Sequence, residues 1–159
     1  MTEPVTIEIK RIAKSISLVS GTRETLEHLK ANGVKLYILS GSIKEIIKTV
    51  LGKLWDHFEE IKANEIIFDS SGIISQIIGT RFDFEGKATF LKRVHEDDHL
   101  SPLNVLFVGN SCNDIWASRS GVRTLCVNPH LTDPSNQLEW TYAIKKMKNL
   151  REILKYVRV

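Results

Sequence analysis

Two short polar segments of this chain carry side chains that could bind an anion, and each follows an apolar run. Ser40-Gly41-Ser42 comes directly after Val34–Leu39, and Gly109–Asp114 comes directly after Val105–Val108. In an open parallel α/β sheet, ligands bind beyond the carboxyl ends of the strands. A helix that begins there presents free backbone N–H groups and the positive end of its dipole, which favour an anion. The sequence therefore predicts a phosphate site at these strand ends.

Four residues are the candidate phosphate ligands. Ser40 offers a hydroxyl donor, Gly41 allows close approach of the backbone, and Asn113 offers a side-chain amide. Lys87 follows Gly86 at the start of another predicted helix and adds a positive charge. Each has an ordinary structural explanation when it is taken singly, for example a turn residue for Ser40. Their order and placement together favour a shared anion site.

The elements that must hold these side chains follow from apolar periodicity and turn residues. Helices are predicted over residues 5–16, about 22–32, about 42–51, from about 86, in a short stretch that Gly121 closes, and over about 148–157. Strands are predicted over residues 34–39, 66–68, 73–78, 105–108 and 122–127, the second and third forming a hairpin. Thr22 and Gly33 are predicted to cap the second helix, and a capping box of Ser42 and Glu45 is predicted to begin the third. Helices that alternate with short apolar strands indicate an α/β fold with a parallel sheet covered on both faces.

The composition fits one globular domain of 159 residues. Lys and Arg number 22 against 19 Asp and Glu, and a net charge of +3 is too small to indicate a nucleic acid or a membrane surface as partner. Two cysteines, Cys112 and Cys126, provide neither a disulfide framework nor a cysteine-based zinc site. No apolar run approaches the roughly 18 residues of a membrane span, and the first ten residues are too polar for a signal peptide. We therefore expect a cytoplasmic location.

Three segments resemble, in order, three of the four motifs of the haloacid dehalogenase superfamily, in the form of its phosphoserine-phosphatase-like members. VKLYILSGS at 34–42 resembles the second motif, FEGKAT at 84–89 the third, and VLFVGNSCNDIWASRSG at 105–121 the fourth. The resemblance implies a Rossmann-like parallel sheet flanked by helices. It also implies that residues 1–16 are the remnant of a helical cap and that residues 17–159 form the core domain.

The resemblance further implies hydrolysis of a phosphomonoester through an aspartyl-phosphate, with magnesium as cofactor. Ser40 would bind the transferring phosphoryl group, and Lys87 would neutralise the charge of phosphate and nucleophile. Gly41 and Asn113 would complete the phosphate site, and Asn110 and Asp114 would hold the magnesium ion. The substrate would be a phosphorylated small molecule.

One motif of the family is missing from this sequence. Family members carry Asp-x-Asp at the end of the first strand, where the first Asp attacks phosphorus and the second acts as acid and base. No Asp precedes Asp56 in this chain. Asn110 is a second departure, because the family usually has an Asp there, and a neutral amide oxygen should bind magnesium more weakly. We therefore expect this chain, on its own, to be without a catalytic residue and inactive.

Three explanations are open at this point. The chain is a fragment of a longer phosphatase, or an inactive homologue that binds a phosphorylated small molecule or a protein partner, or a part of an enzyme whose first strand and aspartates come from another segment or another chain. A missing N-terminal segment or a homo-oligomer is the partner expected to complete the sheet. In the family that strand lies between the second-motif and fourth-motif strands, and its loss would leave backbone groups unpaired. We expect the gap to be closed by rearrangement, by residues 5–16 turning into a strand, or by a partner chain.

Overall fold

Two three-stranded sheets, one in each half of the chain, form the framework of the described part of the protein. The computed structural model describes residues 5–82, 85–129 and 140–158. The chain divides after Phe82 into two units, which we call the N-terminal unit and the C-terminal unit. Each unit combines parallel strands with helices, so the predicted α/β class is confirmed.

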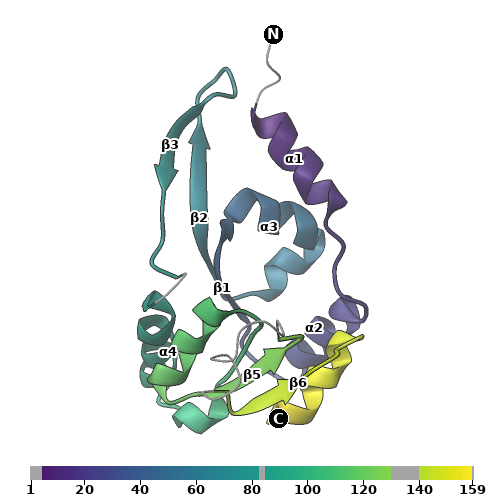
Figure 1. Ribbon diagram of the computed structural model, residues 1–159, viewed down its shortest axis with the longest axis vertical. Coiled ribbons are helices and arrows are strands. Elements are labelled where there is room, and N and C mark those ends of the chain that lie inside the picture. Colours follow the sequence, from purple (N-terminus) through teal and green to yellow (C-terminus); the bar gives the residue numbers. More distant parts are fainter. Residues whose placement is uncertain (1–4, 83–84, 130–139, 159) are drawn as a thin grey trace. The chain divides into compact units, whose positions relative to one another are not determined.

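The sheet of the N-terminal unit has the order β1-β2-β3. β1 (Tyr37–Ile43) runs parallel to β2 (Glu60–Phe68), and β2 forms an antiparallel hairpin with β3 (Ile74–Ile78). α3 (Lys44–Leu51) follows β1 directly, leads into the 3-10 helix η1 (Gly52–His57), and packs beside β2 (Figure 1). The segment Ser40-Gly41-Ser42 lies within the last residues of β1, shortly before α3 begins, whereas the sequence prediction places it after the strand.

Two further helices complete the N-terminal unit: α1 (Val5–Ser15) and α2 (Thr22–Ala31). α1 packs against α3 and buries Ile9 and Ala13, which are four residues apart and so share one helix face. α2 buries Leu26 and Leu29 and packs against η1. The predicted amphipathic helices 5–16 and 22–32 are thus confirmed to within a residue of their ends.

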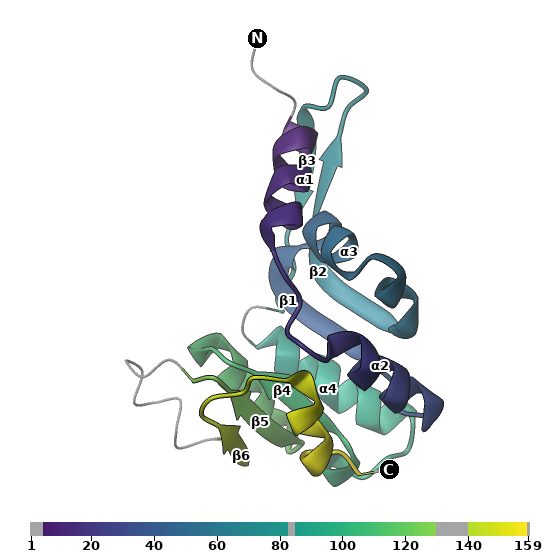
Figure 2. The same cartoon turned by 90° about the vertical axis from the view of Figure 1, so that its right-hand side faces the viewer.

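The sheet of the C-terminal unit consists of three parallel strands in the order β4-β5-β6, seen side by side in Figure 2. The strands are β4 (Leu106–Gly109), β5 (Arg123–Val127) and β6 (Tyr142–Ile144). The central strand β5 is buried along nearly its whole length, and its two polar residues, Arg123 and Thr124, are buried with hydrogen-bond partners. Among the described residues of this unit, the helices are α4 (Gly86–Asp97), η2 (Pro102–Asn104), η3 (Cys112–Ser120) and η5 (Leu150–Tyr156), the last three of 3-10 type.

Two predicted helix caps are wrong. Thr22 is the first residue of α2 rather than its cap, because Gly21 holds the cap position with a φ of 75°, and the Thr22 hydroxyl donates to the Val19 carbonyl. Ser42 lies inside β1, and the cap position of α3 is Ile43, which makes no side-chain capping bond. The prediction that Gly33 ends α2 is confirmed, since Gly33 has a φ of 73° and follows the last turn.

Strand boundaries also differ from the predictions. The strand predicted at residues 34–39 begins and ends later, as β1, and β2 begins at Glu60, six residues before the predicted hairpin arm. β6 has no counterpart among the predicted strands, because three residues carry too little periodicity. The predicted C-terminal helix over residues 148–157 is the shorter 3-10 helix η5.

The strands of the second and fourth motifs do not pair with each other among the described residues. β1 is an edge strand of one sheet, and β4 is an edge strand of the other. Residues 5–15 form α1, so the alternative in which they become the central strand is wrong. Closure by direct pairing of β1 with β4 stays a prediction, because these strands belong to different units, and each unit is described by itself. The supply of a strand by another chain stays a prediction, as does the origin of residues 1–16 in a cap.

Among the residues that the structure describes, no helix is long and apolar enough to cross a membrane.

Candidate functional site

A buried ion pair joins two of the candidate residues in the C-terminal unit. Lys87 is the second residue of α4, and its Nζ lies 2.5 Å from Oδ1 of Asp114 on the first turn of η3. Lys87 is only 4% exposed. α4 and η3 pack against each other, which brings together two side chains that lie 27 positions apart in the sequence. Burial of an unpaired ammonium group is costly, and the carboxylate of Asp114 provides the partner here.

The second carboxylate oxygen of Asp114 is held by the turn between β4 and η3. Oδ2 accepts hydrogen bonds from the N–H of Asn110 at 2.9 Å, from the N–H of Ser111 at 3.1 Å and from the hydroxyl of Ser111 at 3.0 Å. Burial by itself would raise the pKa of Asp114, but the hydrogen bonds from Lys87 and from the two backbone N–H groups outweigh it and hold that pKa below its ordinary value. Asp114 is therefore a fixed anion at the strand end.

Gly109 makes room for this carboxylate at the end of β4. A Cβ atom at position 109 would lie 2.6 Å from Oδ2 of Asp114 and 2.7 Å from its Cβ and Cγ. These distances are far shorter than van der Waals contact, so a side chain here would push Asp114 away. The fourth motif therefore needs glycine directly before Asn110 for a steric reason.

We expect Gly109→Ala to lower the free energy of unfolding by about 1–3 kcal/mol, the usual cost of overpacking. The measurement is urea unfolding followed by circular dichroism. Gly79→Ala is the matched control, because a Cβ at position 79 would meet nothing within 4 Å. Equal stability of the two variants would contradict the steric role of Gly109.

The lowered pKa of Asp114 predicts a pH dependence of stability. A carboxyl whose pKa is depressed by folding contributes its full stabilisation above its unfolded pKa of about 4 and loses it as the pH falls through the lower folded value. We expect the stability advantage of the wild type over Asp114→Asn to be constant between about pH 5 and 7 and to shrink below about pH 4. Urea unfolding of both proteins across this range measures it. An advantage independent of pH would contradict the assignment, because every other carboxyl is the same in both chains.

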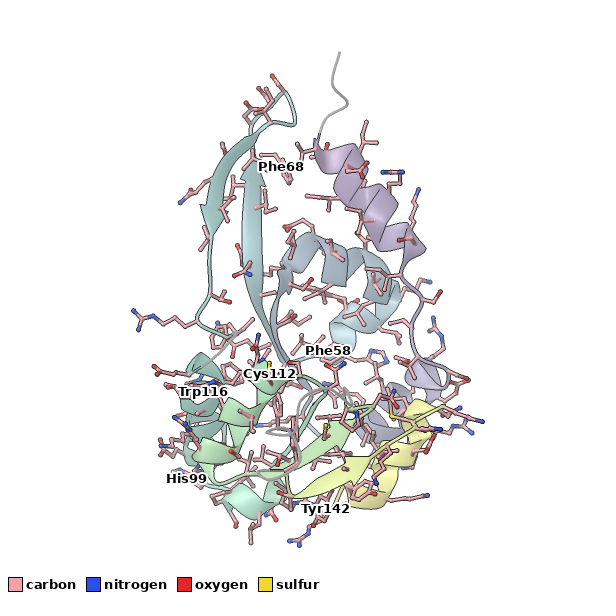
Figure 3. All side chains as sticks on the ribbon, in the orientation of Figure 1. Phe58, Phe68, His99, Cys112, Trp116 and Tyr142 are labelled. Atoms are coloured by element: carbon pink, nitrogen blue, oxygen red, sulfur yellow. The ribbon has the colours of Figure 1, made fainter. Side chains whose placement is uncertain are left out.

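Asn110 and Asn113 flank the ion pair in sequence. Asn110 follows β4 directly and is exposed, and only its backbone N–H is engaged with Asp114 in the contacts described above. Asn113 lies beside Cys112 on the first turn of η3, and the Cys112 thiol is 3.5 Å from Oδ1 of Asn113. Figure 3 places Cys112 and Trp116 on this helix. Both asparagines thus lie at the same strand end as Asp114.

Ser40 and Gly41 lie in the N-terminal unit, within β1 rather than after it. The Ser40 hydroxyl oxygen accepts a hydrogen bond from the N–H of Ser42 at 3.0 Å, which leaves the hydroxyl proton free to be donated elsewhere. The Gly41 carbonyl accepts a hydrogen bond from the side-chain amide of Asn64 at 2.6 Å. The two units are each described by themselves, so the convergence of Ser40 and Lys87 on one anion stays a prediction.

Sequence reasoning missed three contributors to this local geometry. They are Gly109, Ser111 and Asn64. The spacing of Ser111 and Asp114 is the capping-box pattern, and this signal could have been recognised in the sequence. Phe84, which belongs to the predicted third motif, lies outside the described residues.

The donors available for a magnesium ion are few. Asp114 directs one oxygen at an ammonium group and the other at three protein donors, and Asn110 contributes only a neutral amide. The described residues contain no cluster of three or more His, Cys, Asp or Glu side chains that could hold a metal. Magnesium prefers carboxylate oxygens together with phosphate and water. Asn110 and Asp114 alone therefore do not fit a complete magnesium site.

Comparisons with known proteins identify similar chains. A family model described as haloacid dehalogenase-like hydrolase matches residues 3–119. The phosphoserine phosphatase of Methanocaldococcus jannaschii is 24% identical over 153 residues, which cover 95% of this chain and 69% of that protein. The phosphoserine phosphatase of Archaeoglobus fulgidus is 28% identical over 118 residues, 72% of this chain but 33% of that protein. A solved substrate-bound phosphoserine phosphatase complex has the same fold, with a TM-score of 0.78 at 22% identity over 94% of this chain and 68% of that one.

Proposed function

Because this chain belongs to the haloacid dehalogenase-like hydrolase family, we propose that it forms the phosphate-binding part of a phosphomonoester hydrolase of the phosphoserine-phosphatase-like type. The observation that carries the proposal is the buried Lys87–Asp114 pair at a strand end beside a helix N-terminus. The ammonium group of a lysine has three N–H donors, so Lys87 has two further donors for a phosphate oxygen beside the one that Asp114 accepts. The first substrate to test is phosphoserine, which the names of the relatives suggest.

In the proposed site, four residues bind the phosphoryl group. Ser40 donates its hydroxyl proton, Gly41 allows the phosphate to approach the backbone, and Asn113 donates through its amide. Lys87 neutralises charge that develops on the phosphoryl oxygens during transfer. Because Asp114 balances the charge of Lys87, the site carries no large uncompensated positive charge before the phosphate dianion binds.

The chemical step needs a nucleophile that we do not find in this sequence. An aspartate oxygen would bond to phosphorus while the ester P–O bond breaks and the leaving oxygen takes a proton, and water would then cleave the acyl phosphate. No Asp precedes Asp56, and both oxygens of Asp114 are engaged. We propose that the nucleophile comes from a strand supplied by another segment or by another chain that carries the missing aspartates.

We propose magnesium binding only for the site that the strand with the nucleophile has completed. Asn110 and Asp114 would contribute to its site, and the strand that carries the nucleophile would have to bring a further carboxylate. When bound, the ion would offset the negative charge between nucleophile and phosphate.

A second candidate function is supported by a specific observation. Asn110 stands where the family usually has a carboxylate, and the Asp-x-Asp motif is missing. Both departures remove catalytic charge and leave the candidate phosphate ligands in place. They favour a non-catalytic homologue that binds a phosphorylated small molecule or a protein partner. The two candidates differ in whether an added nucleophile restores turnover.

Binding of inorganic phosphate tests what both candidates share. We expect one phosphate per chain, and we expect Ser40→Ala and Asn113→Ala each to weaken its binding by about tenfold, the usual effect of a lost hydrogen bond to a charged group. Isothermal titration calorimetry gives the affinity and the stoichiometry. Ser75→Ala is the control, since the Ser75 hydroxyl bonds to the Ile67 carbonyl in the hairpin. Phosphate binding that neither site variant changes would refute the proposed ligands.

A further inference from the structure

We propose that Asn64 is a positioning residue that holds the phosphate-binding segment Ser40–Ser42 in its working conformation. The inference rests on the proposed function, because it assumes that Ser40 and Gly41 bind phosphate. It concerns a residue of β2 that belongs to none of the motif segments recognised in the sequence.

The register of the parallel pair explains why the segment needs support. Leu39 pairs with Lys62 and Ile43 pairs with Asn64, so β1 uses four residues where β2 uses two. The two additional residues make β1 bulge between these pairs. Bulges often occur beside active sites, where they redirect a side chain and interrupt the backbone ladder. The ladder therefore does not fix the conformation of this segment.

Asn64 supplies the missing connection. Its Nδ2 donates to the Gly41 carbonyl at 2.6 Å, and its Oδ1 accepts from the N–H of Thr80 at 2.7 Å and from the Thr80 hydroxyl at 3.3 Å. The carbonyl can only accept and the backbone N–H can only donate, so these partners fix the orientation of the amide. One side chain thus ties the bulge to the segment that follows β3.

The consequence for the phosphate segment is geometric. Gly41 lies between Ser40 and Ser42. The N–H of Ser42 donates a hydrogen bond to the hydroxyl oxygen of Ser40 at 3.0 Å. If the Gly41 carbonyl rotates, this small turn opens and the Ser40 hydroxyl changes direction. A group that binds a transferring phosphoryl must be held to within a fraction of an ångström. Asn64 would act through Ser40 and Gly41 without touching the phosphate.

Asn64→Asp tests the proposal because it changes one atom type. The carboxylate still accepts from Thr80 but can no longer donate to Gly41. One of its oxygens faces the Gly41 carbonyl oxygen, and the two oxygens repel each other. We expect phosphate binding to weaken by about tenfold. We also expect the ¹⁵N–¹H signals of Gly41 and Ser42 to shift. Asn64→Ala, which introduces no charge, is measured in parallel in case the aspartate prevents folding.

Asn32→Asp is the matched control, since Asn32 also donates its amide to a backbone carbonyl, that of His28 at 2.8 Å, at the end of α2. Its phosphate affinity should stay within about twofold of the wild type. A folded Asn64 variant that binds phosphate as well as the control overturns the inference. If the wild type itself binds no phosphate, the proposed function fails. In that case unchanged Gly41 and Ser42 signals in the Asn64 variants would separately refute the positioning role.

Discussion

We expect Lys87→Met to lower the free energy of unfolding by about 3 kcal/mol or more, the cost of breaking a buried ion pair from one side. Met fills much of the same volume, so the loss comes mainly from the carboxylate of Asp114, which stays buried without its cation. The side chains of this pair are only 5% and 13% exposed, which limits compensation by water. Urea unfolding at pH 7 measures the effect.

A surface ion pair provides the control for this prediction. Nζ of Lys30 lies 2.7 Å from Oε1 of Glu59, but the two side chains are 45% and 43% exposed. Lys30→Met should therefore cost about 1 kcal/mol or less. The double variant Lys87→Met/Asp114→Asn should recover part of the lost free energy of unfolding, because it also removes the carboxylate charge that Lys87→Met leaves buried without a partner. A cost for Lys87→Met no larger than that for Lys30→Met would contradict the role of the buried pair.

The second large effect concerns activity. We expect the purified chain to hydrolyse neither phosphoserine nor an aryl phosphate above the uncatalysed rate, with or without magnesium. Asp114 has both oxygens engaged, and Asp69 accepts the N–H groups of Ser71 and Ile73 in the hairpin turn. An in-line attack on phosphorus needs a carboxylate placed far better than a surface group.

Release of inorganic phosphate, measured colorimetrically, is the readout for this prediction. The phosphoserine phosphatase of Methanocaldococcus jannaschii serves as the positive control under the same conditions. Robust magnesium-dependent turnover by this chain alone would mean that one of its own residues is the nucleophile. The proposal that the nucleophile comes from another segment or chain would then be wrong.

The periodic elements of the fold could be predicted because their signal is local. Ile9 and Ala13 in α1, or Phe90 and Leu91 in α4, are buried where their spacing places them. Helix ends were less predictable, since capping at Thr22 and Ser42 competes with backbone choices such as the left-handed Gly21 and the extension of β1. The extension of β1 depends on its pairing with β2 rather than on local sequence.

The sequence identifies candidate residues of the site, but it does not show which side chains and backbone groups these residues contact. Lys87 and Asp114 were both recognised as candidates, yet their ion pair spans 27 positions and depends on how α4 packs against η3. Asn64 meets Gly41 across 23 positions because of the strand register, and no local pattern encodes that register. A motif identifies which side chains are present, whereas tertiary packing decides which atoms they contact.

The most direct test of the account is to supply the missing nucleophile. The chain is mixed with a synthetic peptide designed to carry Asp-x-Asp on a β-strand, and with the same peptide in which the first Asp is Asn. Phosphate release from phosphoserine is followed, and trapped phosphoryl groups are located by mass spectrometry. The account predicts turnover with the Asp segment only, with the phosphoryl group on that segment's first Asp. Turnover with the Asn segment, or a phosphoryl group on an aspartate of this chain, would contradict the proposed source of the nucleophile. Binding of phosphate without turnover in any mixture would favour the non-catalytic homologue instead.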